Sequence, residues 1–143
     1  MIHSSSNGLL VKASTQALCL LSLMLGGGAF AQTPLHEGAL SSENFRVTAR
    51  TQDSGPLINH IHRWIIHMED PSGQAVEGAQ LQIRGGMPEH NHGLPTSPKM
   101  TRYLGQGDYL IEGMKFHMAG HWQIEIVVSA NNQQDLVTLD LYL

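Results

Sequence analysis

Near the carboxyl end of the chain, His121 to Val128 reads HWQIEIVV, and Leu136 to Leu143 reads LVTLDLYL. Apolar and polar residues alternate in both stretches, which is the pattern of a strand with one face in a core and one face in solvent. Asn131-Asn132 lies between them and favours a turn. The two stretches therefore predict two neighbouring β-strands, and they point to a β-fold for the whole chain.

The same alternation recurs upstream at short intervals. Further strands are predicted over residues 45–51, 57–69, 79–84 and 107–112. Asp53-Ser54-Gly55-Pro56 and Asp70-Pro71-Ser72-Gly73 are turn signals between them, and no stretch after residue 31 has helical periodicity. The fold class predicted for residues 44–143 is all-β, a small immunoglobulin-like antiparallel β-sandwich of about seven strands.

Residues 1–31 have the features of a cleavable secretory signal peptide. Lys12 precedes an apolar run from Ala17 to Leu25, and Ala29-Phe30-Ala31 supplies the A-x-A pattern of a cleavage site. The run is shorter than the about 20 apolar residues of a membrane-spanning helix, although an uncleaved signal anchor is the alternative. We expect a flexible lead-in over residues 32–43 and a periplasmic or secreted protein with no stable membrane insertion.

Histidine is unusually frequent in the expected mature chain, where it outnumbers lysine and arginine together. Residues 32–143 hold eight His, five Met, seven Lys and Arg, and twelve Asp and Glu, which gives a formal net charge of −5. Cys19 lies inside the apolar run, so the mature chain would offer neither a disulfide nor a thiolate. An acidic chain without a basic patch gives no sign of nucleic acid as a partner.

The stretch GGMPEHNHGLPTSPKMT, residues 85–101, combines metal-ligating side chains with a stiff backbone. Its three prolines restrict the chain, and a restricted loop loses less entropy when it closes around a ligand. His90 and His92 are two residues apart, so an extended backbone would bring both imidazoles to one side. Imidazole suits copper, zinc and nickel, whereas the thioether of Met87 selects Cu(I). We interpret the stretch as a metal-binding loop; an exposed polar loop is the alternative.

A second cluster, MKFHMAGHW over residues 114–122, is predicted as a loop at one end of the sandwich. Its candidate ligand is Met118, which could instead fill a gap in the core. His117 is adjacent to Met118, so on an extended backbone the two side chains point to opposite faces and only one easily joins a given site.

His62 is the candidate ligand from the predicted strand 57–69. It shares a face with Trp64 and Ile66, which we expect to point into the core. His62 is therefore either a buried, hydrogen-bonded histidine or a ligand near the rim, and the sequence leaves both open. His67, on the other face, is expected to be structural or exposed.

These clusters together resemble the YtkA-like/FixH-like domain of secreted bacterial proteins. The resemblance covers residues 44–129 and rests on these positions: Met87, Pro88, His90, His92, Gly93, Pro95, Thr96 and Pro98, then Gly107 and Tyr109, then Phe116, Met118, Gly120 and Trp122. It implies an immunoglobulin-like β-sandwich and a role in copper handling, with Met87, His90, His92 and Met118 as ligands and His62 as a further one.

The function predicted from the sequence is a periplasmic copper-binding protein, a chaperone or buffer, that holds copper in a His/Met site formed by two loops. Cu(I) is favoured over Cu(II), because thioethers select it and thiolates are absent. The expected partner is a copper-accepting membrane or periplasmic protein. Zinc binding through imidazoles and a metal-free adaptor for another secreted or membrane protein are the alternatives. Neither G-x-S-x-G nor H-E-x-x-H occurs, so no enzyme is predicted.

Overall fold

The computed structural model describes residues 33–35, 40–53 and 55–143, and all regular structure in them is β-strand. The strands are β1 (Thr33–Pro34), β2 (Leu40–Ser41), β3 (Arg46–Thr51), β4 (Ile61–Glu69), β5 (Gln80–Met87), β6 (His92–Gly93), β7 (Lys99–Gly105), β8 (Asp108–Lys115), β9 (His121–Ala130) and β10 (Gln133–Tyr142). The predicted signal peptide lies outside the described residues. In the part of the chain that is described, no helix could cross a membrane.

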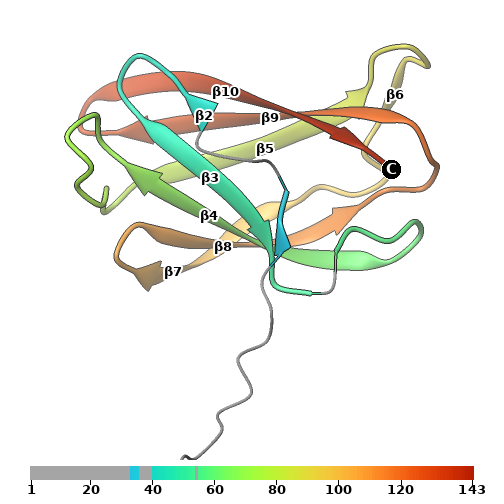
Figure 1. The fold of residues 1–143 in the computed structure, drawn as a ribbon, viewed down its shortest axis with the longest axis horizontal. Coiled ribbons are helices and arrows are strands. Elements are labelled where there is room, and N and C mark those ends of the chain that lie inside the picture. The colour runs from blue at the N-terminus through green and yellow to red at the C-terminus, as the bar shows by residue number, and fades with distance from the viewer. Residues whose placement is uncertain (1–32, 36–39, 54) are drawn as a thin grey trace, which may run out of the picture.

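The strands pair antiparallel in the order β1-β3-β4-β8-β7-β5-β9-β10, with β2 on β3 and β6 on β5. The junction between β7 and β5 is a single paired position, Gln82 opposite Lys99. On either side of this narrow junction the strands form two layers, β3-β4-β8-β7 and β5-β9-β10, which face each other across a core (Figure 1). The predicted all-β antiparallel sandwich is confirmed.

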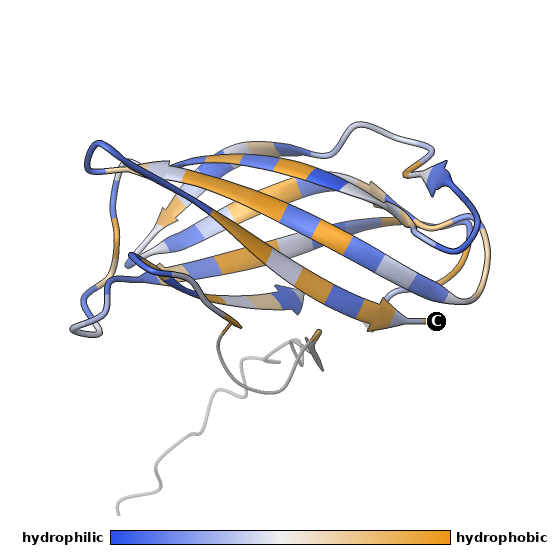
Figure 2. Ribbon diagram, turned by 90° about the horizontal axis from the view of Figure 1, so that it is seen from above, coloured by the Kyte–Doolittle hydropathy of each residue, from blue (hydrophilic) through white to orange (hydrophobic). Residues whose placement is uncertain are grey.

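The alternation that predicted β9 and β10 is visible as alternating colours along the strands in Figure 2. Ile124 and Ile126 of β9 are buried, as are Val137 and Leu139 of β10, and Ile126 pairs with Val137. Asn131 and Asn132 turn the chain between the two strands with φ of 53° and 60°. The left-handed conformation has a lower free-energy cost for asparagine than for most other non-glycine residues. The predicted turn is therefore confirmed, and the two asparagines explain why it forms there.

The strands differ in several places from those predicted. β4 begins at Ile61, because residues 57–60 belong to the connection that precedes it. β5 continues through both glycines to Met87 instead of ending at Arg84. β7 was not predicted at all: most of its residues are exposed, so it has no apolar alternation to reveal it.

The predicted lead-in also contributes to the sheet. β1 pairs with the end of β3, and β2 pairs with its start. Asn44, just after β2, donates hydrogen bonds from its backbone and side-chain nitrogens to the Asp135 carboxylate at 2.8 and 2.9 Å. These contacts join the amino-terminal segment to β10 of the other layer, and they depend on partners far away in the sequence that a local pattern does not reveal.

Tyr109 links β8 to the connection between β4 and β5. Its buried hydroxyl donates to the Val76 carbonyl at 2.8 Å and accepts from the Ala79 backbone N–H at 3.0 Å. Gly107, two residues earlier, has φ +80°, and a side chain there would collide with the Met68 carbonyl oxygen. The two positions of the Gly-x-Tyr motif therefore have structural roles.

Replacing Tyr109 with phenylalanine should lower the free energy of unfolding by about 1–3 kcal/mol, because two buried backbone groups lose their partner. Urea unfolding of both proteins measures the difference. Tyr142→Phe is the matched control, since Tyr142 is 75% exposed and its change should have little effect. Equal losses in the two variants would contradict the structural role of the Tyr109 hydroxyl.

Candidate metal centre

Three connections meet at one end of the sandwich, at the right of Figure 1: residues 55–60, the β5–β6 turn, and the β8–β9 connection. Ile58 forms a bridge with Phe116, which joins the first connection to the third. The Met87 methyl group at the end of β5 lies against Gly120 of the β8–β9 connection. The two predicted histidine- and methionine-containing loops are therefore neighbours in space.

The segment predicted as a free loop is a tight hairpin. Met87 of β5 pairs with His92 of β6, and Gly86 pairs with Gly93. The His90 N–H donates to the Met87 carbonyl at 3.1 Å, and Asn91 takes φ of 52°. His90 therefore lies on the turn and His92 on the returning strand, so the expected extended backbone does not occur, although the two imidazole rings still lie side by side.

Glycine is required where the hairpin strands approach most closely. A Cβ at Gly86 would lie 2.5 Å from the carbonyl oxygen of His92, whereas a Cβ at Gly93 would meet only the Gly85 oxygen at 3.8 Å. Backbone atoms cannot yield as a flexible side chain can, so Gly86 determines how closely β6 approaches β5. It thereby positions His92, whose side chain is exposed.

The two thioethers are more buried than the exposed His90 and His92. Met87 is only 1% exposed and belongs to the core, and its methyl carbon would be 2.7 Å from a Cβ at Gly120. Met118 is partly buried and packs against the same core. The Met118 carbonyl accepts the indole N–H of Trp122 at 3.1 Å, which fixes this part of the connection.

The imidazoles form a row that crosses from one loop to the other. The ring centres of His90 and His92 are 6.4 Å apart with nearly parallel planes at 21°. The His92 ring is 5.9 Å from that of His117, at 82°. The His117 ring lies in turn 5.4 Å from the buried Trp122, at 81°. His117 is the residue in this row that was not among the predicted ligands.

His117 has a buried nitrogen without a partner. Its Nδ1 has no contact with solvent and no hydrogen bond among the described residues. A buried polar atom left in this state costs about 1–3 kcal/mol, so such atoms usually have a water or an ion as partner. The Nδ1 atom can bind a metal when it is not protonated, so His117 has a ring nitrogen that is not already used in a hydrogen bond.

The described residues contain no group of three or more His, Cys, Asp or Glu side chains arranged to hold one ion as they stand. The predicted ligand set differs from such a group, because it includes the thioethers of Met87 and Met118. The exposed His90 ring is also free to turn on its side-chain bonds. A site at this end of the sandwich would therefore combine two kinds of donor and close around the ion as it binds.

The imidazole contacts of His62 among the described residues are with Leu57 and Phe116. His62 is 2% exposed, and its Nε2 lies 2.9 Å from the backbone nitrogen of Leu57 and 2.8 Å from the Leu57 oxygen. Its ring lies next to Phe116, with centres 6.3 Å apart. The sequence left two roles open for His62, and this geometry is that of a buried histidine that anchors the β3–β4 connection to β4.

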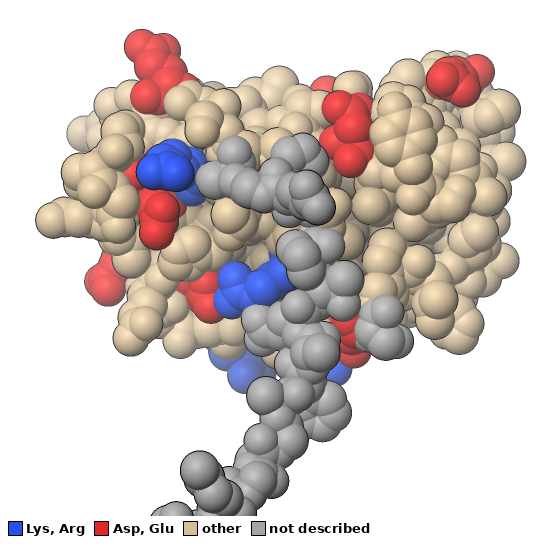
Figure 3. All heavy atoms as spheres, in the orientation of Figure 1, with Lys and Arg blue, Asp and Glu red and all other residues tan. Residues whose placement is uncertain are grey.

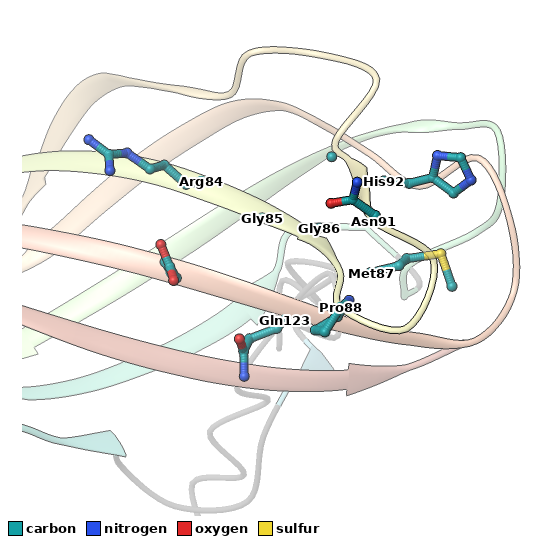
Figure 4. A pocket seen from close by; sticks show the side chains of 10 residues that line it. Arg84, Gly85, Gly86, Met87, Pro88, Asn91, His92 and Gln123 are labelled. Carbon is teal, nitrogen blue, oxygen red and sulfur yellow. The ribbon is translucent and has the colours of Figure 1, made fainter.

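A hollow of about 410 Å³ lies beside the hairpin, and Figure 4 shows the side chains that line it. It is lined by Arg84, Gly85, Gly86, Met87, Pro88, Asn91, His92, Gly93, Gln123 and Glu125. Met87 and His92 extend in the same direction past the end of β5, whereas Arg84 lies further back along the strand. The lining includes no residue of the β8–β9 connection, so the junction of the two loops is a different place from this hollow.

Two other histidines have partners outside the candidate centre. His67 Nδ1 lies 2.7 Å from the Asp108 carboxylate, which also binds Arg50, and this agrees with the expected structural role. His121 Nε2 lies 2.7 Å from Asp140, and its ring stacks on Tyr142 with centres 4.7 Å apart.

Comparison with known proteins gives a family match and likenesses to solved structures. The model of the family described as YtkA-like matches residues 40–127. No curated protein matches the chain. Among solved structures, the GAE domain of GGA2p from Saccharomyces cerevisiae shares 13% sequence identity with a TM-score of 0.41, over 79% of this chain and 96% of that one.

Proposed function

The chain belongs to the YtkA-like family, and we propose that it is a periplasmic copper-binding protein that carries or buffers the ion at the end of its sandwich. The observation that supports this most is the meeting of two loops rich in histidine and methionine. Met87 lies against Gly120, and the His92 and His117 rings are 5.9 Å apart across the junction. A copper ion bound there would be held from both loops.

Several residues of the family-like motifs have packing roles. Tyr109, Phe116 and Trp122 are buried, and Gly107 and Gly120 take positive φ. His90 and His92, in contrast, are exposed, and neither has a hydrogen bond from its imidazole among the described residues. Packing gives no reason for two neighbouring exposed imidazoles on a hairpin, whereas ligand binding does.

The donor chemistry favours Cu(I). Imidazole and thioether together suit Cu(I), and neither is consumed by disulfide formation in an oxidising compartment. In this proposal His90 and His92 capture the ion from solvent, and Met87 and Met118 bind it from the core side. Open access through the exposed histidines suits a carrier that passes copper to an accepting protein.

Metal retention by the purified protein tests the proposal. After dialysis with Cu(I) under reducing conditions we expect about one copper per chain, and protein without bound copper would refute the carrier role. Zinc is the alternative cargo, since imidazoles alone suit it. The Met87→Leu and Met118→Leu changes should weaken copper binding and leave zinc binding unchanged, because thioether is a poor zinc ligand; an unchanged copper affinity would contradict the thioether part of the site.

An adaptor role is the second candidate, and an exposed apolar cluster favours it. Leu57, Ile58 and Ile61 are 52%, 38% and 67% exposed in and just after the connection that reaches the candidate centre. The face seen in Figure 3 has few charged side chains over much of its area. If the protein is only an adaptor, removing His90 and His92 leaves partner binding intact and independent of metal.

A further inference from the structure

His117 occupies a place that the core determines. It follows Phe116, which is buried and bridged to Ile58, at the start of the β8–β9 connection. Its ring stands edge-on to buried Trp122 on one side and to exposed His92 on the other. The position of the imidazole is therefore fixed by packing before any ion binds, which lowers the entropy cost of using it as a ligand.

The unpartnered Nδ1 of His117 distinguishes it from the other buried polar atoms without partners. Among the described residues these are Gln52 Oε1, Trp64 Nε1 and His117 Nδ1. The indole nitrogen of Trp64 is a donor only and cannot bind a cation. The amide oxygen of Gln52 is a ligand for Mg²⁺ and Ca²⁺ more than for copper, whereas His117 offers a nitrogen and lies beside His92. Only His117 combines an unpartnered nitrogen with a second metal-ligating side chain.

The spacing of the rings also selects His117. Two imidazoles that bind one ion through nitrogens about 2.0 Å from it have ring centres roughly 4.5 to 6.3 Å apart, depending on the angle between the two bonds. The His92–His117 pair, at 5.9 Å, is within this range, whereas the His90–His92 pair, at 6.4 Å, is just beyond it and nearly parallel. The pair across the two loops is therefore closer to a binding arrangement than the pair within the hairpin.

We propose that His117 is a ligand of the copper site and that, with His92, it joins the two loops through the ion. This inference rests on the proposed function. The sequence suggested His62 as the further imidazole ligand, and the inference gives that role to His117 instead. His92 and His117 form the nucleus of the site, and His90 turns inward to complete it. With three imidazoles the site retains Cu(II) as well as Cu(I), because nitrogen ligands suit Cu(II).

Cu(II) binding to the full protein tests this assignment. His117→Ala should lower the Cu(II) affinity by about 10- to 100-fold, measured by competition with a chromophoric chelator. His117→Phe keeps a ring against Trp122 without any nitrogen, so the same loss in this variant separates ligation from packing. His121→Ala is the matched control in the same region and should bind as the wild type does. Circular dichroism and urea unfolding establish that each variant is folded.

A second readout is the fluorescence of Trp122. Cu(II) bound at His117 would lie next to this indole and quench it, while Zn(II), which has no unpaired electron, would quench far less. The quenching should be lost in His117→Phe and in Trp122→Phe, which retains Trp64 as the other tryptophan.

The outcomes separate the two proposals. If His117→Phe binds Cu(II) as tightly as the wild type while the His90→Ala/His92→Ala double variant is weakened, His117 is not a ligand and the copper function stands. If the wild-type protein binds neither Cu(I) nor Cu(II), both proposals are overturned. A loss in His117→Phe alone, with the double variant unaffected, also overturns the paired site.

Discussion

Replacing both His90 and His92 with alanine should weaken Cu(I) binding by about a hundredfold or more, because the ion loses the two ligands that reach solvent. A competition titration with a chromophoric Cu(I) chelator under reducing conditions measures the change. The fold should be unaffected, since both side chains are exposed and no described hydrogen bond from either imidazole is lost.

The matched control removes the same number of histidines elsewhere. His60→Ala/His121→Ala takes away two imidazoles, and no ring contact joins either to His90 or His92 among the described residues. This control should bind copper as the wild type does. If both double variants lose affinity equally, the protein binds copper through scattered surface histidines, and the hairpin has no special role.

Replacing Gly86 with alanine should reduce copper affinity by about tenfold or more without changing any ligand. The added Cβ would lie 2.5 Å from the His92 carbonyl oxygen, so β6 must move away from β5 and carry His92 with it. A shift of this kind separates His92 from His117, so the ligands are no longer held in position before the ion binds and the affinity falls. Because β6 has only two residues at the edge of the sheet, the rest of the sandwich should remain folded.

Gly93 provides the control for Gly86, since the two glycines pair with each other across the hairpin. A Cβ at Gly93 meets only the Gly85 oxygen at an ordinary 3.8 Å, so Gly93→Ala should bind copper nearly as well as the wild type. Equal affinities for Gly86→Ala and Gly93→Ala would contradict the dependence of the site on the position of His92. The same titration and urea unfolding of both variants separate affinity from stability.

The fold was predictable from the sequence wherever burial of one strand face produces a regular alternation of apolar and polar residues. β9 and β10 alternate apolar and polar residues, and Asn131-Asn132 marks the turn between them, so both elements follow from local patterns. β7 escapes such a prediction because its residues are mostly exposed and its place is set by pairing with β8. The pairing of β1 and β2 with β3 likewise depends on partners distant in the sequence.

The candidate centre was predictable in its loops but not in its individual ligands. The stiff segment around His90 and the cluster around Met118 were identified from residue type and proline content. Which side chain of the second cluster faces the first depends on the backbone between Lys115 and His121, where Gly120 has φ of +128°. The alternation of an extended strand places His117 and Met118 on opposite faces but does not tell which of them lies beside His92, where the structure has the His117 ring.

The role of His62 depends on a contact that a sequence pattern cannot contain. Alternation placed it correctly on the inward face of β4, where it is buried. Its Nε2 lies within hydrogen-bond distance of the backbone of Leu57, five residues earlier, and this contact exists only because the β3–β4 connection folds back over the strand. A buried histidine and a metal-bound histidine both need a hydrogen-bond partner for a ring nitrogen, so only the three-dimensional structure distinguishes the two roles.

The central claim is that two loops together hold the ion, and the most direct test compares the protein with one loop alone. The peptide GGMPEHNHGLPTSPKMT, residues 85–101, contains Met87, His90 and His92 but nothing of the β8–β9 connection. Competition for Cu(I) with the same chelator gives both affinities. We predict that the protein binds about a hundredfold more tightly than the peptide, since it adds donors and a preorganised backbone. Equal affinities for protein and peptide would contradict a site built from two loops.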